Sequence, residues 1–208
     1  MKRAKAYDRE KALDAALELF WLKGYHATSL KDLEGTLGMK PGSIYAAFKS
    51  KEALYLASLE RYARRFRDTM RQQVAEANSP LAALADLLRA FARPAGGDGA
   101  GRACMLLKTL LDATADDAAI AASARRYLDD MKAEIAGFFT RARDRGELPP
   151  DADVRHLALR YQADLMALRI EAHRGTDPGD LAALAESMAQ DIERLRTRDP
   201  ALAASRAC

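Results

Sequence analysis

Residues 28–51 read TSLKDLEGTLGMKPGSIYAAFKSK, and this stretch decides the fold. Its apolar residues recur at helical spacing in two runs, which are Leu30, Leu33 and Leu37, then Ile44, Tyr45 and Phe48. Ser29 is a candidate helix cap, because its hydroxyl can accept from the unpaired N–H groups of a first turn. Gly38 suits the left-handed end of a helix, and Pro41 suits the first turn of the next one. The stretch therefore predicts two short helices joined by a tight turn, and Ser50 can cap a third helix.

Two short helices around a glycine turn are the helix-turn-helix geometry, in which the second helix enters the major groove of DNA. Small residues on that second helix let its backbone lie close to the bases. Ser43 can bond a phosphate or a base, and the methyl groups of Ala46 and Ala47 can touch a thymine methyl group. Three lysines can supply positive charge for phosphates, and they are Lys40, Lys49 and Lys51. A helical hairpin in an ordinary bundle would show the same spacing, so the pattern alone leaves both interpretations open.

Residues 16–54 resemble the DNA-binding domain of TetR-family transcriptional regulators. The resemblance rests on LFWLKGYHATSLKDL and on LGMKPGSIYAAFKSKEAL, and it covers about a quarter of the chain. The Gly-Tyr pair before Thr-Ser, the Ser-Ile-Tyr of the second helix and the Phe-Lys-Ser-Lys-Glu-Ala-Leu exit are jointly specific. One departure is Glu34, beside Gly35, because family members usually carry a small residue there. A glutamate would be costly to bury unpaired where two helices cross closely.

The resemblance implies an all-α fold, with an N-terminal three-helix helix-turn-helix head followed by a larger helical body. The head would occupy residues 1–51, and the ligand-binding and dimerisation body residues 52–198. Tyr45 and Lys51 match family positions that touch phosphate. The residues that we expect to contact DNA are Ser29, Lys40, Pro41, Gly42, Ser43, Tyr45, Ala46, Ala47 and Lys51.

The composition is that of a soluble globular protein. The chain has 208 residues, of which 49% are hydrophobic and 30% charged, enough for one large domain or two small ones. Abundant alanine and few aromatic residues favour helix throughout. No segment approaches the length of apolar residues that spans a membrane, and the N-terminus lacks the apolar core of a signal peptide. Two cysteines make no disulfide framework. We therefore expect a cytoplasmic protein.

The positive charge gathers near the N-terminus. The net charge is +3, and residues 1–51 hold ten basic and six acidic residues, so the rest of the chain is close to neutral. This asymmetry fits a DNA-binding head on a neutral body. Residues 2–5 could form a basic arm on phosphates, although a terminus without a role fits equally well. A later basic run, Arg61, Arg64, Arg65 and Arg67, is expected to be a solvated face rather than a second DNA contact.

The remaining chain also reads as helix. The expected helices span residues 8–23, 50–77, 81–93, 102–113, 116–145, 153–174 and 180–198. The glycine-rich residues 94–101 lack the strand and the Lys-Ser/Thr of a phosphate-binding loop, so we expect a simple connection. Residues 199–208 are expected to be a disordered tail. The last two helices are expected to form the dimer interface, because this is their role in the resembling family, and Leu184 and Met188 lie on the final apolar stripe.

No group of residues indicates catalysis. The histidines His26, His156 and His173 are scattered, and no spacing of histidine, cysteine and carboxylate resembles a metal site. No serine stands in a nucleophile-elbow context. We therefore expect no enzyme activity, no cofactor and no metal. A helical scaffold or enzyme that does not touch DNA is the competing hypothesis.

Cys104 is a candidate redox sensor. It lies in GRACMLLKTLLD at an expected helix start, with Arg102 beside it and Lys108 one turn on. A helix N-terminus and neighbouring cations favour the reactive thiolate. The segment also resembles one found in a TetR subgroup that includes electrophile- and chlorine-sensing repressors. A buried cysteine that packs as a small hydrophobic residue is the alternative.

The sequence therefore predicts a dimeric DNA-binding regulator, most simply a repressor. Two recognition helices related by a twofold axis would read a palindromic operator. A small apolar effector in the body would shift the spacing of the two heads. A thiol-based sensor of oxidants or electrophiles is a variant of the same regulator.

Overall fold

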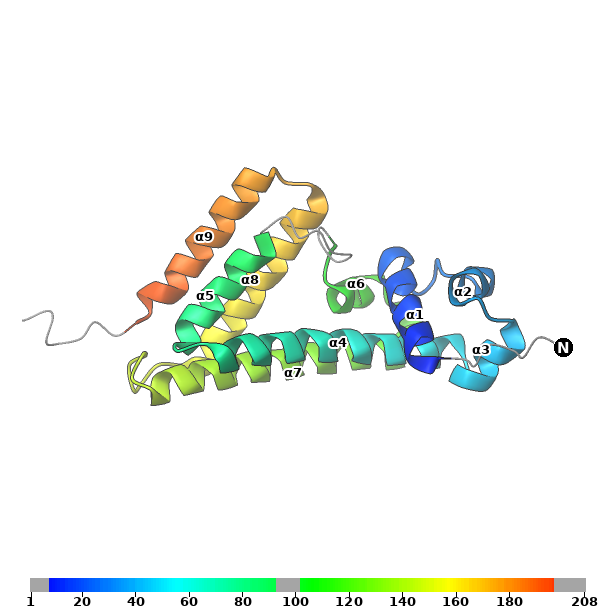
Figure 1. The fold of residues 1–208 in the computed structure, drawn as a ribbon, viewed down its shortest axis with the longest axis horizontal. Helices are drawn as coiled ribbons and strands as arrows, with labels where there is room; N and C mark the ends of the chain where they lie inside the picture. Colours follow the sequence, from blue (N-terminus) through cyan, green and yellow to red (C-terminus); the bar gives the residue numbers. More distant parts are fainter. Residues whose placement is uncertain (1–7, 93–101, 197–208) are drawn as a thin grey trace, which may run out of the picture. The chain divides into compact units, whose positions relative to one another are not determined.

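The computed structural model describes residues 8–92 and 102–196, and every regular element in these ranges is a helix (Figure 1). The elements are α1 (Arg9–Lys23), α2 (Leu30–Leu37), α3 (Pro41–Phe48), α4 (Lys51–Glu76), α5 (Pro80–Ala92), α6 (Met105–Asp112), the short 3₁₀-helix η1 (Ala115–Asp117), α7 (Ala118–Asp144), α8 (Val154–Arg174) and α9 (Pro178–Arg194). No helix of the described residues is long and apolar enough to cross a membrane. The predicted basic arm, glycine-rich connection and C-terminal tail lie outside the described residues.

The chain forms two compact units. The first holds described residues 8–66 and 105–128, and the second holds described residues 67–92, 102–104 and 129–196. The division falls inside α4 and α7, so each of these helices contributes to both units. The first unit therefore contains more than the three expected head helices, because it includes the start of α4, all of α6 and the start of α7. The functional division predicted at residue 51 stays a prediction.

In the first unit, α1 buries an apolar stripe and contacts both α2 and α4. The stripe consists of Ala12, Leu13, Ala16, Leu17 and Phe20, all buried. Asp8 caps the helix by accepting from the backbone N–H of Lys11 at 3.3 Å. The Phe20 ring meets Tyr55 of α4 edge-on, with ring centroids 4.9 Å apart.

Two arginines of the basic run on α4 bind carboxylates of α1. Arg61 donates to Asp14, with Nη2 and Oδ2 2.8 Å apart, and also to Glu10. Arg65 donates to Asp14 as well. The Arg61 side chain is only 13% exposed. The expectation of a solvated face is therefore wrong for Arg61, because its guanidinium joins two helices of the first unit.

In the second unit, α5 packs against α8 and α9. Ser79 caps α5 by accepting from the backbone N–H of Ala82 at 3.1 Å. The Tyr161 hydroxyl of α8 donates to the Leu84 carbonyl of α5 at 2.8 Å. Arg89 of α5 pairs with Glu186 of α9, with Nε and Oε2 2.7 Å apart. A buried hydroxyl and a charged pair thus fix α5 against both of its neighbours.

The predicted helices are found, with shifted ends. The last helix begins at Pro178 rather than residue 180, because Asp177 caps it and a proline fits the first turn. It ends at Arg194 rather than residue 198. Ile170 of α8 is apolar but 46% exposed. It lies nine residues after buried Tyr161, which places it on roughly the opposite side of a helix.

Candidate nucleic-acid interface

A capping box starts α2, the first helix of the helix-turn-helix motif. The Ser29 hydroxyl oxygen accepts from the backbone N–H of Asp32 at 3.1 Å, and Asp32 Oδ2 accepts from the Ser29 N–H at 2.8 Å. Lys23 at the end of α1 holds Asp32 Oδ1 at 2.6 Å. The Lys23 ammonium, followed by the hydrogen bonds from Ser29, keeps the pKa of Asp32 well below its usual range. Residues close in sequence thus fix the entry to the motif.

The turn between α2 and α3 has the predicted chemistry. Gly38 ends α2 in the left-handed conformation, at φ 61°, and Pro41 is the first residue of α3. The inner faces of the two helices bury Leu33, Ile44 and Phe48. These apolar contacts hold α3 against the rest of the unit and fix which of its sides faces outward.

The outward side of α3 carries most of the expected DNA contacts. Lys40, Gly42, Ser43, Tyr45 and Ala46 are exposed, and Pro41 and Ala47 are partly exposed. Tyr45 was also expected on the apolar face with Ile44 and Phe48, and this is wrong, because its side chain is 44% exposed. One residue turns a helix by about 100°, so the neighbour of buried Ile44 points elsewhere. Small and polar groups thus share one accessible surface.

Lys51 stands over an aromatic ring rather than fully in solvent. Its Nζ atom lies 4.5 Å from the centroid of the Tyr25 ring. Partial burial lowers the pKa of Lys51. The ring holds the ammonium in one place at the start of α4, so a phosphate contact there would need little reordering of the side chain.

Lys49 occupies a strained backbone position between α3 and α4. It has φ 70° and ψ −51°, and the Ser50 N–H donates to the Phe48 carbonyl across it at 2.9 Å. This three-residue turn is rare and strained for a residue with a side chain. Among the described residues other than glycine, Lys49 alone has a positive φ.

Ser29 is the expected DNA contact that the structure supports least. Its hydroxyl already donates to Asp32 Oδ2 at 2.8 Å, so a phosphate oxygen would have to replace that carboxylate.

Glu34, where this chain departs from the family pattern, does not disturb the packing of the motif. Glu34 is partly exposed, and a Cβ atom added at the exposed neighbour Gly35 would meet nothing within 4 Å. The helices do not cross closely at this point, so Glu34 is not forced into the core.

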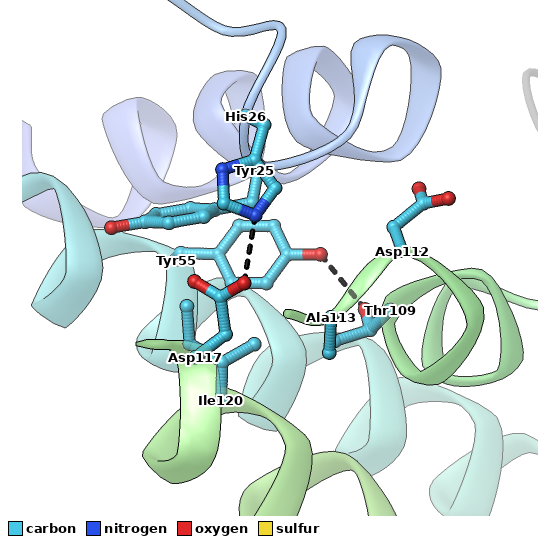
Figure 2. A pocket seen from close by; sticks show the side chains of 8 residues that line it. All are labelled: Tyr25, His26, Tyr55, Thr109, Asp112, Ala113, Asp117 and Ile120. Carbon is cyan, nitrogen blue, oxygen red and sulfur yellow. Dashed lines mark hydrogen bonds and ion pairs between the residues drawn. The ribbon is translucent and has the colours of Figure 1, made fainter. Parts of the chain in front are cut away.

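Figure 2 shows a small pocket in the same unit as the motif. Its volume is about 10 Å³, room for about one water molecule. The lining residues are Tyr25, His26, Tyr55, Thr109, Asp112, Ala113, Asp117 and Ile120. Across it, His26 and Asp117 lie 2.8 Å apart between Nε2 and Oδ2, and the Tyr55 hydroxyl bonds Thr109 at 2.8 Å. In residues 8–92 and 102–196, no three metal-binding side chains are arranged to hold an ion.

The pairing of His26 with Asp117 was missed in the sequence, which suggested only scattered histidines. The two residues are 91 positions apart, and no local pattern links them. The segment GYHATSL offered the one usable signal, since it placed His26 in the turn directly before the motif.

Cys104 lies directly before α6, and its side chain is 3% exposed. Lys108 was expected to favour a reactive thiolate, but its ammonium donates to the Leu22 carbonyl of α1 at 3.0 Å. A buried cysteine of this kind can pack as a small apolar residue. The redox role of Cys104 stays a prediction.

Comparisons with known proteins cover both parts of the chain. Residues 12–58 match the family of bacterial regulatory proteins named after TetR, and residues 80–188 match a tetracycline-repressor-like C-terminal domain. The chain is 34% identical over 174 residues to the HTH-type transcriptional repressor ComR of Escherichia coli strain K12, an alignment that covers 83% of each protein.

Solved structures agree with these matches. A cysteine mutant of the TetR-family regulator CifR, solved with a 26 bp double-strand operator DNA, superposes with a TM-score of 0.81 at 28% identity. The alignment covers 90% of this chain and 98% of that one. A TetR regulator from Chloroflexus aurantiacus J-10-FL gives a TM-score of 0.75 at 26% identity, over 90% and 95% of the two chains. The chain therefore belongs to the TetR family of bacterial regulatory proteins.

Proposed function

We propose that this chain is a transcriptional repressor that reads duplex DNA with α3. The observation that carries the proposal is the two-sided character of α3, which buries Ile44 and Phe48 and exposes Gly42, Ser43 and Ala46. Small and hydroxyl side chains on an exposed helix suit the major groove, where they meet base edges and thymine methyl groups. Phosphates would be held by the lysines around α3. The similarity to the repressor ComR and to operator-bound CifR supports this function. A cytoplasmic location belongs to the proposal, because bacterial DNA lies there.

The proposed active form is a homodimer on a palindromic operator. On α8, four apolar residues recur at the spacing of one helix face, and they are Leu159, Ala163, Met166 and Ile170. Leu159 is 55% exposed and Ile170 is 46% exposed in the single chain. A second copy related by a twofold axis would cover this stripe and present a second α3 to the other half-site.

The proposed signal is a small apolar effector bound by the second unit. The match of residues 80–188 to a tetracycline-repressor-like domain supports an effector-binding role. An effector shifts the equilibrium only if it binds one arrangement of the dimer more tightly than another. We propose that it binds an arrangement that does not fit the operator, so that less protein remains on the DNA.

A selection experiment tests the DNA-binding proposal. The purified protein selects duplexes from a random-sequence library, and fluorescence anisotropy then measures its affinity for the enriched duplex and for an unrelated duplex of equal length. We expect an enriched sequence with twofold symmetry, and an affinity that falls steeply with salt on both duplexes. A scaffold or enzyme that does not bind DNA would retain neither duplex at low salt, and the proposal would then be abandoned.

A further inference from the structure

The segment of residues 105–128 belongs to the same compact unit as the helix-turn-helix motif, although residues 52–104 separate them in the sequence. It contacts Tyr55 of α4, the end of α1 and the turn between α1 and α2. This turn comprises residues 24–29 and leads directly into the motif. The position of this turn fixes where α2 begins.

Lys108 of α6 binds the last turn of α1. Its ammonium donates to the Leu22 carbonyl at 3.0 Å and approaches the Trp21 carbonyl at 3.4 Å. The final carbonyls of a helix have no N–H partner within that helix, and they form its negative end. A lysine there both satisfies these oxygens and attaches the end of α1 to α6.

Asp117 binds the turn itself through His26. Asp117 Oδ2 accepts from the Thr114 N–H at 2.8 Å and from its hydroxyl at 2.7 Å, and it also bonds His26 Nε2 at 2.8 Å. The hydrogen bonds from Thr114, then the one from His26, lower the pKa of Asp117. An ionised carboxylate only accepts, so His26 Nε2 is the donor. Asp117 is 8% exposed, whereas His26 is 52% exposed.

The turn has little freedom to adopt another path. Gly24 has φ 85° and ψ 172°, a conformation that only glycine adopts readily. A Cβ atom there would lie 3.4 Å from Asp112 Oδ2 of α6. The fully buried Thr28 donates its hydroxyl to the Gly24 carbonyl at 2.7 Å. The turn is thus closed on itself and held by α6 on one side and Asp117 on the other.

We propose that Lys108 and Asp117 are positioning residues for DNA binding, which hold the turn between α1 and α2 so that the motif keeps its operator-binding arrangement. The inference rests on the proposed function and adds the residues that position its DNA-binding motif. Residues 105–128 would control operator affinity without touching DNA.

Direct contact of His26 or Lys108 with phosphate is the competing explanation, and a double-mutant cycle separates the two. Operator affinity is measured for the unmodified protein, His26→Ala, Asp117→Ala and the double variant, on the duplex selected from the random library. We expect His26→Ala to weaken affinity roughly tenfold and to have no further effect when Asp117 is already alanine. The salt slope should stay unchanged, because no phosphate contact is lost.

Four further variants test the roles of charge and folding. His26→Gln keeps an N–H donor and should restore the affinity that His26→Ala loses. Asp116→Ala removes an exposed carboxylate one residue away and should bind like the unmodified protein. Lys108→Met should weaken binding, whereas Lys132→Met, with the same change of charge in the second unit, should not. Thermal unfolding of each variant fixes a temperature at which all are folded.

Trp21, the one tryptophan of the chain, provides a readout without DNA. Loss of the ammonium near its carbonyl in Lys108→Met should shift its fluorescence emission. A shifted emission with unchanged operator affinity would overturn the proposal, as would unchanged affinity in all variants. Additive losses with a salt slope lower by about one for His26→Ala would also overturn it and assign His26 to a phosphate. If the unmodified protein binds no duplex at all, the proposed function itself fails.

Discussion

At the scale of single residues, Lys51 combines a fixed position with a positive charge beside α3. Its ammonium lies 4.5 Å from the centroid of the Tyr25 ring. We predict that Lys51→Ala weakens binding to every duplex by a similar factor and lowers the salt slope by about one unit, because one phosphate contact is lost. Anisotropy titrations at several salt concentrations measure this, with Lys132→Ala as a control of equal charge. An unchanged slope would show that Lys51 does not touch a phosphate.

Lys49 stores backbone strain that a glycine would relieve. A side chain at φ 70° costs about 1 kcal/mol relative to glycine, which reaches this region freely. We predict that Lys49→Gly raises the free energy of unfolding by up to about 1 kcal/mol, less the entropy that glycine gains in the unfolded chain. Urea unfolding measures the difference. Lys49→Ala keeps the strain and loses the same charge, so an equal gain in both variants would assign the effect to charge instead.

Residues whose partners are near in sequence could be predicted, and those with distant partners could not. Ser29, Gly38 and Pro41 act through their own or adjacent turns, so their residue types alone indicated the geometry that the structure shows. His26 meets Asp117 across 91 positions, and this pairing depends on how the first unit packs. The exposed face of α3 was foreseen as a set of residues, while the capture of the Ser29 hydroxyl by Asp32 was not.

At the scale of elements, Arg61 joins α4 to α1. Its guanidinium is largely buried and donates to Asp14 and Glu10. We predict that Arg61→Met lowers the free energy of unfolding by about 1–2 kcal/mol, because charge-assisted hydrogen bonds are lost and two carboxylates are left close together. Arg64→Met, an exposed neighbour on α4, is the matched control in urea unfolding. An equal decrease in the free energy of unfolding in the two variants would mean that the contact between α1 and α4 does not depend on Arg61.

The contact between α5 and α9 makes stability depend on pH. The guanidinium of Arg89, and after it the amide of Gln190, lowers the pKa of Glu186 from 4.5 to about 2. A carboxyl whose pKa is lowered by folding stabilises the protein at pH values above its pKa in the unfolded chain. This stabilisation is lost as the pH falls towards its pKa in the folded protein. We therefore predict that the free energy of unfolding declines as pH drops below about 5, and that Glu186→Gln shows a shallower decline.

Urea unfolding at a series of pH values between about 5.5 and 3 measures this dependence. Glu60→Gln, which replaces an exposed glutamate of α4, is the control and should keep the slope of the unmodified protein. The prediction is wrong if Glu186→Gln and Glu60→Gln follow the same curve.

The helices could be predicted because apolar spacing and caps are local features of the sequence. Which apolar residues of each helix are buried was harder to predict. Tyr45 was assigned to the apolar face of α3, but it is exposed, and so is the apolar Ile170 of α8. Each follows a truly buried residue by a step that rotates it away from the core. Apolar character alone does not distinguish a residue that packs inside the chain from one that packs against a partner.

At the scale of the whole molecule, the same ambiguity bears on the proposed dimer. Leu184 and Met188 were expected at the interface, but in the single chain both are already partly covered. Charged replacements there would disturb the fold as well as any dimer. Leu159 and Ile170 are more exposed, and they lie eleven residues apart, within about 20° of one another around the axis of α8. Replacing them therefore tests the dimer with little cost to the monomer.

We predict that Leu159→Glu combined with Ile170→Glu yields a folded monomer with weak operator affinity. Four like charges would meet across a twofold interface, and a single head loses the contacts that the second head adds on a palindrome. Light scattering at micromolar concentration measures the mass, and circular dichroism confirms the helical fold. Glu replacement of two exposed residues of α4, Arg64 and Gln73, is the matched control and should leave a dimer. If the unmodified protein is itself monomeric at these concentrations, the proposed dimer is wrong.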